Sequence, residues 1–118
     1  MQPISNMDIE FTNRRIQKLC SSEREGIKRL GPNCARRLRA RMADLLAATR
    51  LEDLRNVPGT GRLHELTGNR KGQFAMDLLH PYRLIFEPTE NPPPLKDDGG
   101  LDWLQITAVT IVEVVDYH

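Results

Sequence analysis

The sequence predicts an α+β domain in which helices come before most of a sheet. Apolar residues recur at helical spacing between residues 14 and 47, and they alternate at strand spacing between residues 62 and 87. Residues 105–115 carry apolar side chains on both faces of a strand, which is typical of a strand covered on both sides. A chain of 118 residues with 39% apolar side chains fits a single domain, residues 1–118, with its own core.

Local signals predict one strand followed by helices in the first part of the chain. Residues 8–11 alternate as a short strand, and Thr12 or Asn13 can cap the helix that follows. Residues 22–25 have the form of a capping box, which indicates a break and restart and so predicts two short helices or one kinked helix. Gly31 and Pro32 then end this helical segment and begin the next helix. Its apolar stripe consists of Cys34, Ala35, Leu38, Met42, Leu45 and Leu46.

The second part of the chain is predicted to form strands and turns. A short helical turn over residues 51–56 precedes a break at residues 58–61. The predicted strands are residues 62–66, 73–79, 82–87 and 105–115. Residues 88–100 contain four prolines and two glycines and are expected to form a long surface loop, which Trp103 anchors to the core.

Arg83 stands out within the strand of residues 82–87. Tyr82, Leu84 and Phe86 alternate with Arg83, Ile85 and Glu87. Successive side chains of a strand point to opposite faces, so Arg83 is expected on the face opposite its aromatic neighbours. It is therefore a candidate site residue.

Charge is distributed unevenly, although the net charge is only +1. Residues 12–41 carry ten basic and two acidic side chains, whereas residues 84–118 carry one basic and seven acidic ones. A basic segment inside a foldable region favours binding to phosphate or to an acidic protein, and a solvated helix surface is the alternative interpretation. Arg36, Arg37 and Arg41 are the candidate RNA or phosphate contacts of this segment.

The sequence lacks the features of a membrane or secreted protein. No apolar stretch reaches the roughly 18 to 20 residues that span a bilayer, and the first residues do not resemble a secretory signal, so a cytoplasmic location is expected. Cys20 and Cys34 fit no metal or redox spacing, and we expect both to be buried thiols.

The residues that can carry chemistry gather at the predicted end of the sheet. Residues 116–118, Asp-Tyr-His, combine a carboxylate, a phenol and an imidazole, and His64 lies on a neighbouring strand. Hairpins over residues 62–87 would bring basic side chains to the same end, namely Arg62, Arg70, Lys71 and Arg83. Such a set suits phosphoryl transfer on RNA, with proton donors and acceptors and cations against the phosphorane. We expect no metal and no cofactor, since the spacing of these residues matches no metal motif.

Three segments together resemble the HigB branch of the RelE/ParE toxin superfamily, also called plasmid maintenance system killer proteins. They are residues 63–74, LHELTGNRKGQF; residues 80–88, HPYRLIFEP; and residues 116–118, DYH. The resemblance spans almost the whole chain, and its motifs are specific in combination.

The resemblance implies a RelE-like fold, a small twisted antiparallel sheet packed by N-terminal α-helices. It also implies a type II toxin that enters the A site of the 70S ribosome, cleaves translated mRNA and is inhibited by a HigA-like helix-turn-helix antitoxin. The matching active-site positions are His64, Asp116, Tyr117 and His118, with Arg83 and Arg70 on phosphate. Thr67 departs from relatives that have lysine there.

The mechanism expected from this resemblance divides proton transfer between two groups. His118 is the general base on the 2′-hydroxyl, and Asp116 orients it. His64 or Tyr117 is the acid toward the leaving oxygen, and Arg83 stabilises the transition state. The base and acid roles can be exchanged.

Three alternatives stay open at this point. A ParE-like protein of the same fold would inhibit DNA gyrase by binding and without catalysis. A non-catalytic RNA- or ribosome-binding domain would use only the arginine-rich helices and would bind in a salt-sensitive way. An inactive toxin kept within a regulatory complex is the third, for which Thr67 leaves room.

Overall fold

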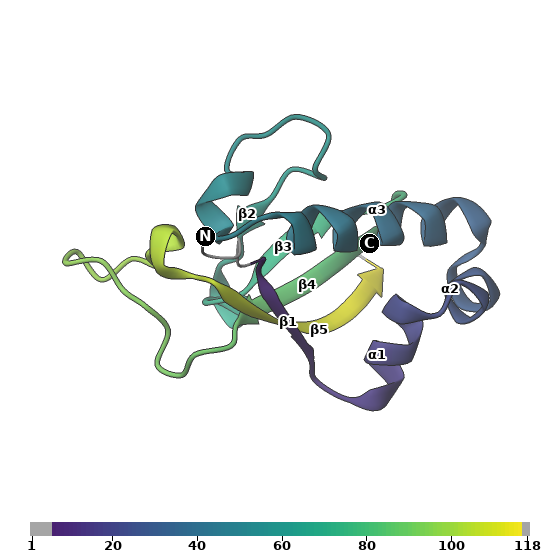
Figure 1. Cartoon of the computed structure of the whole chain (residues 1–118), viewed down its shortest axis with the longest axis horizontal. Coiled ribbons are helices and arrows are strands. Elements are labelled where there is room, and N and C mark those ends of the chain that lie inside the picture. Colours follow the sequence, from purple (N-terminus) through teal and green to yellow (C-terminus); the bar gives the residue numbers. More distant parts are fainter. Residues whose placement is uncertain (1–5, 117–118) are drawn as a thin grey trace, which may run out of the picture.

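The structure, a computed structural model, describes residues 6–116 and confirms the α+β class (Figure 1). Its helices are α1 (Arg14–Ser21), α2 (Glu23–Leu30) and α3 (Pro32–Ala47). Its strands are β1 (Asp8–Phe11), β2 (His64–Glu65), β3 (Phe74–Asp77), β4 (Tyr82–Pro88) and β5 (Ala108–Asp116). Three short 3₁₀ helices are η1 (Leu51–Leu54), η2 (Gly68–Arg70) and η3 (Trp103–Gln105).

The predicted helix boundaries are confirmed at the capping residues. The Asn13 side chain accepts a hydrogen bond from the Ile16 amide at 2.9 Å and so caps α1. Ser22 ends α1 and also caps α2 through the Glu25 amide. Gly31 has a φ of +83°, which suits a glycine between two helices, and Pro32 begins α3.

The five strands form one mixed sheet in the order β1-β5-β4-β3-β2. Neighbouring strands from β2 to β5 pair antiparallel, as expected for this fold, whereas β1 pairs parallel with β5. A parallel pair needs a long connection, and the whole chain from α1 to η3 lies between these two strands.

Two expectations about the strands need correction. The strands predicted over residues 62–66 and 73–79 shorten to His64–Glu65 and Phe74–Asp77. Left-handed residues lie before and after the first strand, and residues 78–82 form the turn that follows the second. The prediction that both faces of the last strand are covered is wrong. Val109 and Ile111, which share one face, are buried, whereas Ala108, Thr110 and residues 112–115 are half-buried, since the core lies on one face only.

The core lies between α3 and that one face of the sheet. Leu38 and Leu45 of α3 join a cluster with Phe74 and Phe86, whose rings stack at a centroid distance of 5.5 Å. Trp103 meets Phe74 edge to face and is 6% exposed, so it anchors the chain after the long loop as predicted. Residues 89–100 project from the body of the molecule (Figure 1).

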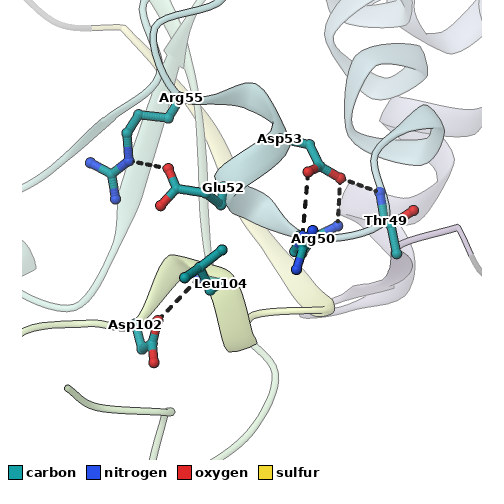
Figure 2. A network of polar contacts seen from close by, with 7 residues as sticks. All are labelled: Thr49, Arg50, Glu52, Asp53, Arg55, Asp102 and Leu104. Atoms are coloured by element: carbon teal, nitrogen blue, oxygen red, sulfur yellow. Dashed lines mark hydrogen bonds and ion pairs between the residues drawn. The ribbon is translucent and has the colours of Figure 1, made fainter.

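Local polar contacts cap η1 and η3, and contacts between the two segments hold them beside each other. The Asp53 carboxylate accepts hydrogen bonds from the Thr49 and Arg50 amides, and Asp102 caps η3 at Leu104 (Figure 2). The bonds from Arg50 and Thr49 lower the pKa of Asp53. The Arg55 guanidinium lies 3.8 Å from the centroid of the Trp103 ring, which ties η1 to the core. These contacts hold the start of the segment that leads into β2.

Within residues 6–116, no helix is both long and apolar enough to cross a lipid bilayer.

Replacing Leu38 by alanine should lower the free energy of unfolding by about 2–5 kcal/mol, because its side chain is 1% exposed and leaves a cavity in the core. Leu46 on the same helix is 52% exposed, and Leu46→Ala should change stability by less than about 0.5 kcal/mol. Urea denaturation followed by circular dichroism measures both. Equal losses in the two variants would contradict this placement of α3.

The two thiols should react slowly in the folded protein. Both are free and buried, as predicted; burial raises the pKa of Cys20 to about 11 and raises that of Cys34 as well. Because the thiolate is the reactive form, a chromogenic disulfide reagent at pH 7 should label both cysteines only as the chain unfolds. Rapid labelling of either cysteine without urea would show that it is accessible.

Candidate nucleic-acid interface

The face of the sheet opposite the core carries a group of polar side chains. Residues paired across neighbouring strands share a face. One row consists of His64, Ala75, Ile85 and Glu113. The next row consists of Asp77, Arg83 and Val115. Neighbours of these residues in β3 and β4, such as Met76 and Leu84, belong to the core cluster. The rows therefore lie on the other side, here called the open face, which includes Arg83 as its alternation predicts.

A β-bulge in β5 decides which side chains of that strand reach the open face. Phe86 pairs with Ile111, and Ile85 pairs with Glu113, so Val112 is an extra residue between them. Ile111 lies in the core, whereas Glu113, two residues later, lies on the open face. Without the bulge these two residues would share a face.

The ring of His64 is held in one orientation by the backbone of Arg62, two residues earlier. Its Nδ1 atom lies 2.6 Å from the carbonyl oxygen of Arg62. A carbonyl oxygen only accepts hydrogen bonds, so Nδ1 carries the hydrogen and Nε2 is the unprotonated nitrogen of the neutral ring. His64 also lines a cavity of about 350 Å³ together with Arg62 and residues 56–60. The ring can therefore accept a proton at Nε2 when neutral and donate one when charged.

Asp77 connects two arginines at the end of the open face. Its Oδ2 atom lies 2.6 Å from Arg62 Nε, and its Oδ1 atom lies 3.4 Å from Arg83 Nε. The hydrogen bond to Asp77 raises the pKa of Arg62. Arg62 has a φ of +52°, a left-handed conformation that is unfavourable for a residue other than glycine. Such strain persists where the surrounding contacts fix the backbone, often at functional sites.

Arg70 occupies the middle of the open face. It reaches back from η2 to form an ion pair with Glu113, and its Nη1 atom donates to Gln73 at 2.9 Å. Together with Arg62 and Arg83 it places three guanidinium groups against the carboxylates of Asp77 and Glu113. Glu87, two residues after Ile85 on the same face of β4, adds a third carboxylate, so acidic side chains balance the three guanidinium groups. Lys71 and Thr67 are exposed on the adjoining turn.

The structure brings only some of the predicted site residues together. Asp116 pairs with Tyr82, so the described end of β5 lies beside the turn between β3 and β4. In register, however, Asp116 shares the face of Tyr82, opposite Arg83. Tyr117 and His118 lie outside the described residues, and the roles of all three stay predictions.

The helical arginines divide into two groups. Arg36 and Arg37 are exposed on α3 and belong to the basic surface predicted for residues 12–41. The Arg41 side chain is 14% exposed and lies 3.0 Å from Asp44, so it stands apart from that surface. Gly61, which follows α3 in the chain, packs against the Arg41 side chain. Helical periodicity alone could not predict this contact.

Three residues of the site were missed by sequence reasoning. His80 lines a cleft with Arg62 and Arg83, although its turn position gave no sign of function. Asp77 and Glu113 contact the arginines. Asp77 could have been found from the hairpin register, since it faces Arg83 across the β3–β4 pair, whereas Glu113 depends on the bulge.

The described residues define an α+β protein with arginines, carboxylates and a histidine on one face of its sheet. Among residues 6–116, no group of three His, Cys, Asp or Glu side chains could hold a metal ion. No protein family model and no curated protein matches the chain. Among solved structures it is similar to a chain of the YoeB-YefM complex from Staphylococcus aureus. The TM-score is 0.47 and the identity 14%, over 95% of this chain and 97% of that one. A likeness this distant carries no argument about function.

Gly61 should be required for the site to form. Its φ is +79°, and an added Cβ would lie 2.7 Å from the Asp77 carbonyl oxygen. Gly59 has a similar φ of +81°, but its Cβ would meet nothing within 4 Å. Gly59→Ala should therefore cost about 1–2 kcal/mol for the left-handed backbone alone, and Gly61→Ala should cost more. Urea denaturation compares them, and an equal cost would show that Gly61 is not held against β3.

Proposed function

We propose that this protein is the toxin of a type II toxin–antitoxin system, an mRNA endoribonuclease that acts on translated message in the ribosomal A site. The proposal rests on the HigB-like motifs of the sequence and on one feature of the open face. His64, with its tautomer fixed, lies one row from Arg83, about 7 Å along the strands and two strands, about 10 Å, across the sheet. A proton-transfer group thus shares one face of the sheet with a cation of the kind that binds phosphate.

The proposed reaction is an attack of the ribose 2′-hydroxyl on the neighbouring phosphorus atom. A base removes the hydroxyl proton, the bond from phosphorus to the 5′-oxygen breaks, and an acid protonates that oxygen. The products are a 2′,3′-cyclic phosphate and a free 5′-hydroxyl. His64 supplies one of the two proton transfers through Nε2, and His118 supplies the other, with Asp116 and Tyr117 as its supporting groups. Arg83 offsets charge on the phosphorane, as a preorganised cation does in other phosphoryl transfers.

Binding to the ribosome and to an antitoxin would use other parts of the surface. Exposed cations of the helices, including Arg36 and Arg37, suit ribosomal RNA, whose phosphates attract clustered arginine and lysine. Arg70 and Lys71 suit the message next to the cleaved bond. A HigA-like antitoxin would inhibit the protein by covering one of these basic surfaces with an acidic or amphipathic segment.

The decisive experiment is cleavage of a defined mRNA on 70S ribosomes, with the product ends determined chemically. The wild-type protein should cut at the A-site codon and leave a 2′,3′-cyclic phosphate. His64→Ala, Arg83→Ala and His118→Ala should each reduce the rate by about 10²-fold or more, which is typical for loss of an acid, a base or a transition-state cation.

Lys96→Ala is the matched control, since Lys96 is a cation on the long loop, paired with Asp98 and distant from the open face. It should cleave at the wild-type rate. An intact message in the wild-type reaction, combined with arrest of growth on expression, would overturn the nuclease. Inhibition of gyrase would then be measured, as the ParE-like alternative requires.

A further inference from the structure

A second polar cleft lies at the turn between β3 and β4, next to Arg83. It has a volume of about 110 Å³, which suits one small polar group. Its lining comes from the turn itself and from the segment before β2, and includes Arg62, Asp77, His80, Tyr82 and Arg83. Because Asp116 pairs with Tyr82, the cleft lies at the same end of the sheet as the described end of β5.

The side chains that line this cleft include hydrogen-bond donors suited to an anion. Arg62 and Arg83 bring two guanidinium groups, and the exposed His80 ring adds a third hydrogen-bond donor from the turn. Asp77 is the one carboxylate of the lining. The contact given for each arginine is with its Nε atom. A guanidinium carries five N–H donors, so Arg62, whose side chain is mostly exposed, keeps donors for a ligand beside its bond to Asp77.

Asp77 also fixes the backbone from which Arg62 extends. The Asp77 amide donates to the Gly61 carbonyl at 2.6 Å, and the Asp77 carboxylate holds the Arg62 side chain. Gly61 and Arg62 both have positive φ, so the chain turns sharply at this point. The side chain of Arg62 is nevertheless 71% exposed, which leaves most of it open to a ligand. One residue of β3 thus sets both the backbone and the side chain of Arg62.

We propose that this cleft binds a phosphodiester of single-stranded RNA, the one next to the bond that is cleaved. Arg62 and His80 are its donors, Arg83 lies between the two phosphates, and Asp77 is a positioning residue. The proposal rests on the proposed function for the identity of the ligand. The row of His64 and the row of Asp77 are about 7 Å apart along the strand, comparable with the distance between neighbouring phosphates of an RNA chain.

The test is binding of a 2′-O-methyl hexanucleotide, which cannot be cleaved, to the full chain without ribosomes. Fluorescence anisotropy gives the affinity at several salt concentrations, and ¹⁵N NMR of the arginine Nε and histidine ring signals locates the ligand. Arg62→Ala and His80→Ala should each weaken binding about 3- to 10-fold. Arg62→Ala should also reduce the slope of log affinity against log salt by about 0.7, the value for one phosphate contact on a single strand.

The Asp77→Asn variant distinguishes two effects of Asp77 on binding, namely its positioning of Arg62 and its negative charge. The substitution removes a negative charge, so charge alone predicts tighter binding, whereas loss of positioning predicts binding weakened several-fold. Asp98→Asn removes a charge of the same sign on the long loop and should leave binding within about 2-fold. Urea denaturation checks that Asp77→Asn folds; if it does not, Arg62→Ala and His80→Ala decide the question.

Several results would overturn the inference. Arg62→Ala and His80→Ala could bind as Lys96→Ala does, or Asp77→Asn could bind more tightly than wild type. Inorganic phosphate could also occupy the cleft as tightly as the hexanucleotide, which would show a site for a free oxyanion and not for RNA. Because the ligand is not cleaved, these outcomes are independent of the ribosome assay. Cleavage that does not depend on Arg62 and His80 would leave the nuclease and remove only this subsite.

Discussion

The contact on which the site depends is the one between Asp77 and the turn at Gly61 and Arg62. A short backbone hydrogen bond joins Asp77 to Gly61, and the carboxylate joins Arg62 to Arg83. Arg62 adopts an unfavourable backbone conformation that an isolated chain would leave, so its position is a property of the folded sheet and not of the local sequence. The same turn directs the carbonyl of Arg62 toward His64 and thereby fixes the tautomer of the ring. One side chain of β3 therefore controls a cation, a second cation and a proton-transfer group.

The rest of the site follows from a sheet that packs helices on one face only. Leu38 and Leu45 of α3 cover the core face, and the opposite face carries polar side chains around the buried Ala75 and Ile85. An unpaired guanidinium on such a surface would be solvated and mobile, whereas each arginine here has a carboxylate partner. The carboxylates hold these guanidinium groups in place, so they can meet an anion without large rearrangement of their side chains.

The sequence predicts the features that depend on neighbouring residues. Asn13 and Ser22 cap helices as their residue types and spacing require, and the alternation around Arg83 places it on the correct face. What could not be predicted depends on contacts between distant residues. The bulge at Val112 moves Glu113 to the open face, and strand alternation alone gives the wrong face for it. The sequence alone predicts that Arg41 is a surface cation. The turn that buries it lies 20 residues later in the chain, so this burial could not be predicted.

The two outer strands of the sheet are short. β1 has four residues and β2 has two, while the longest strands, β4 and β5, lie inside the sheet. A long exposed edge invites other chains to pair with it, and short edges together with charged residues such as Asp8 and Glu10 discourage that pairing. The sheet therefore has little backbone to offer to another copy of itself. A protein with this arrangement can accumulate at high concentration without growing into fibrils through its edges.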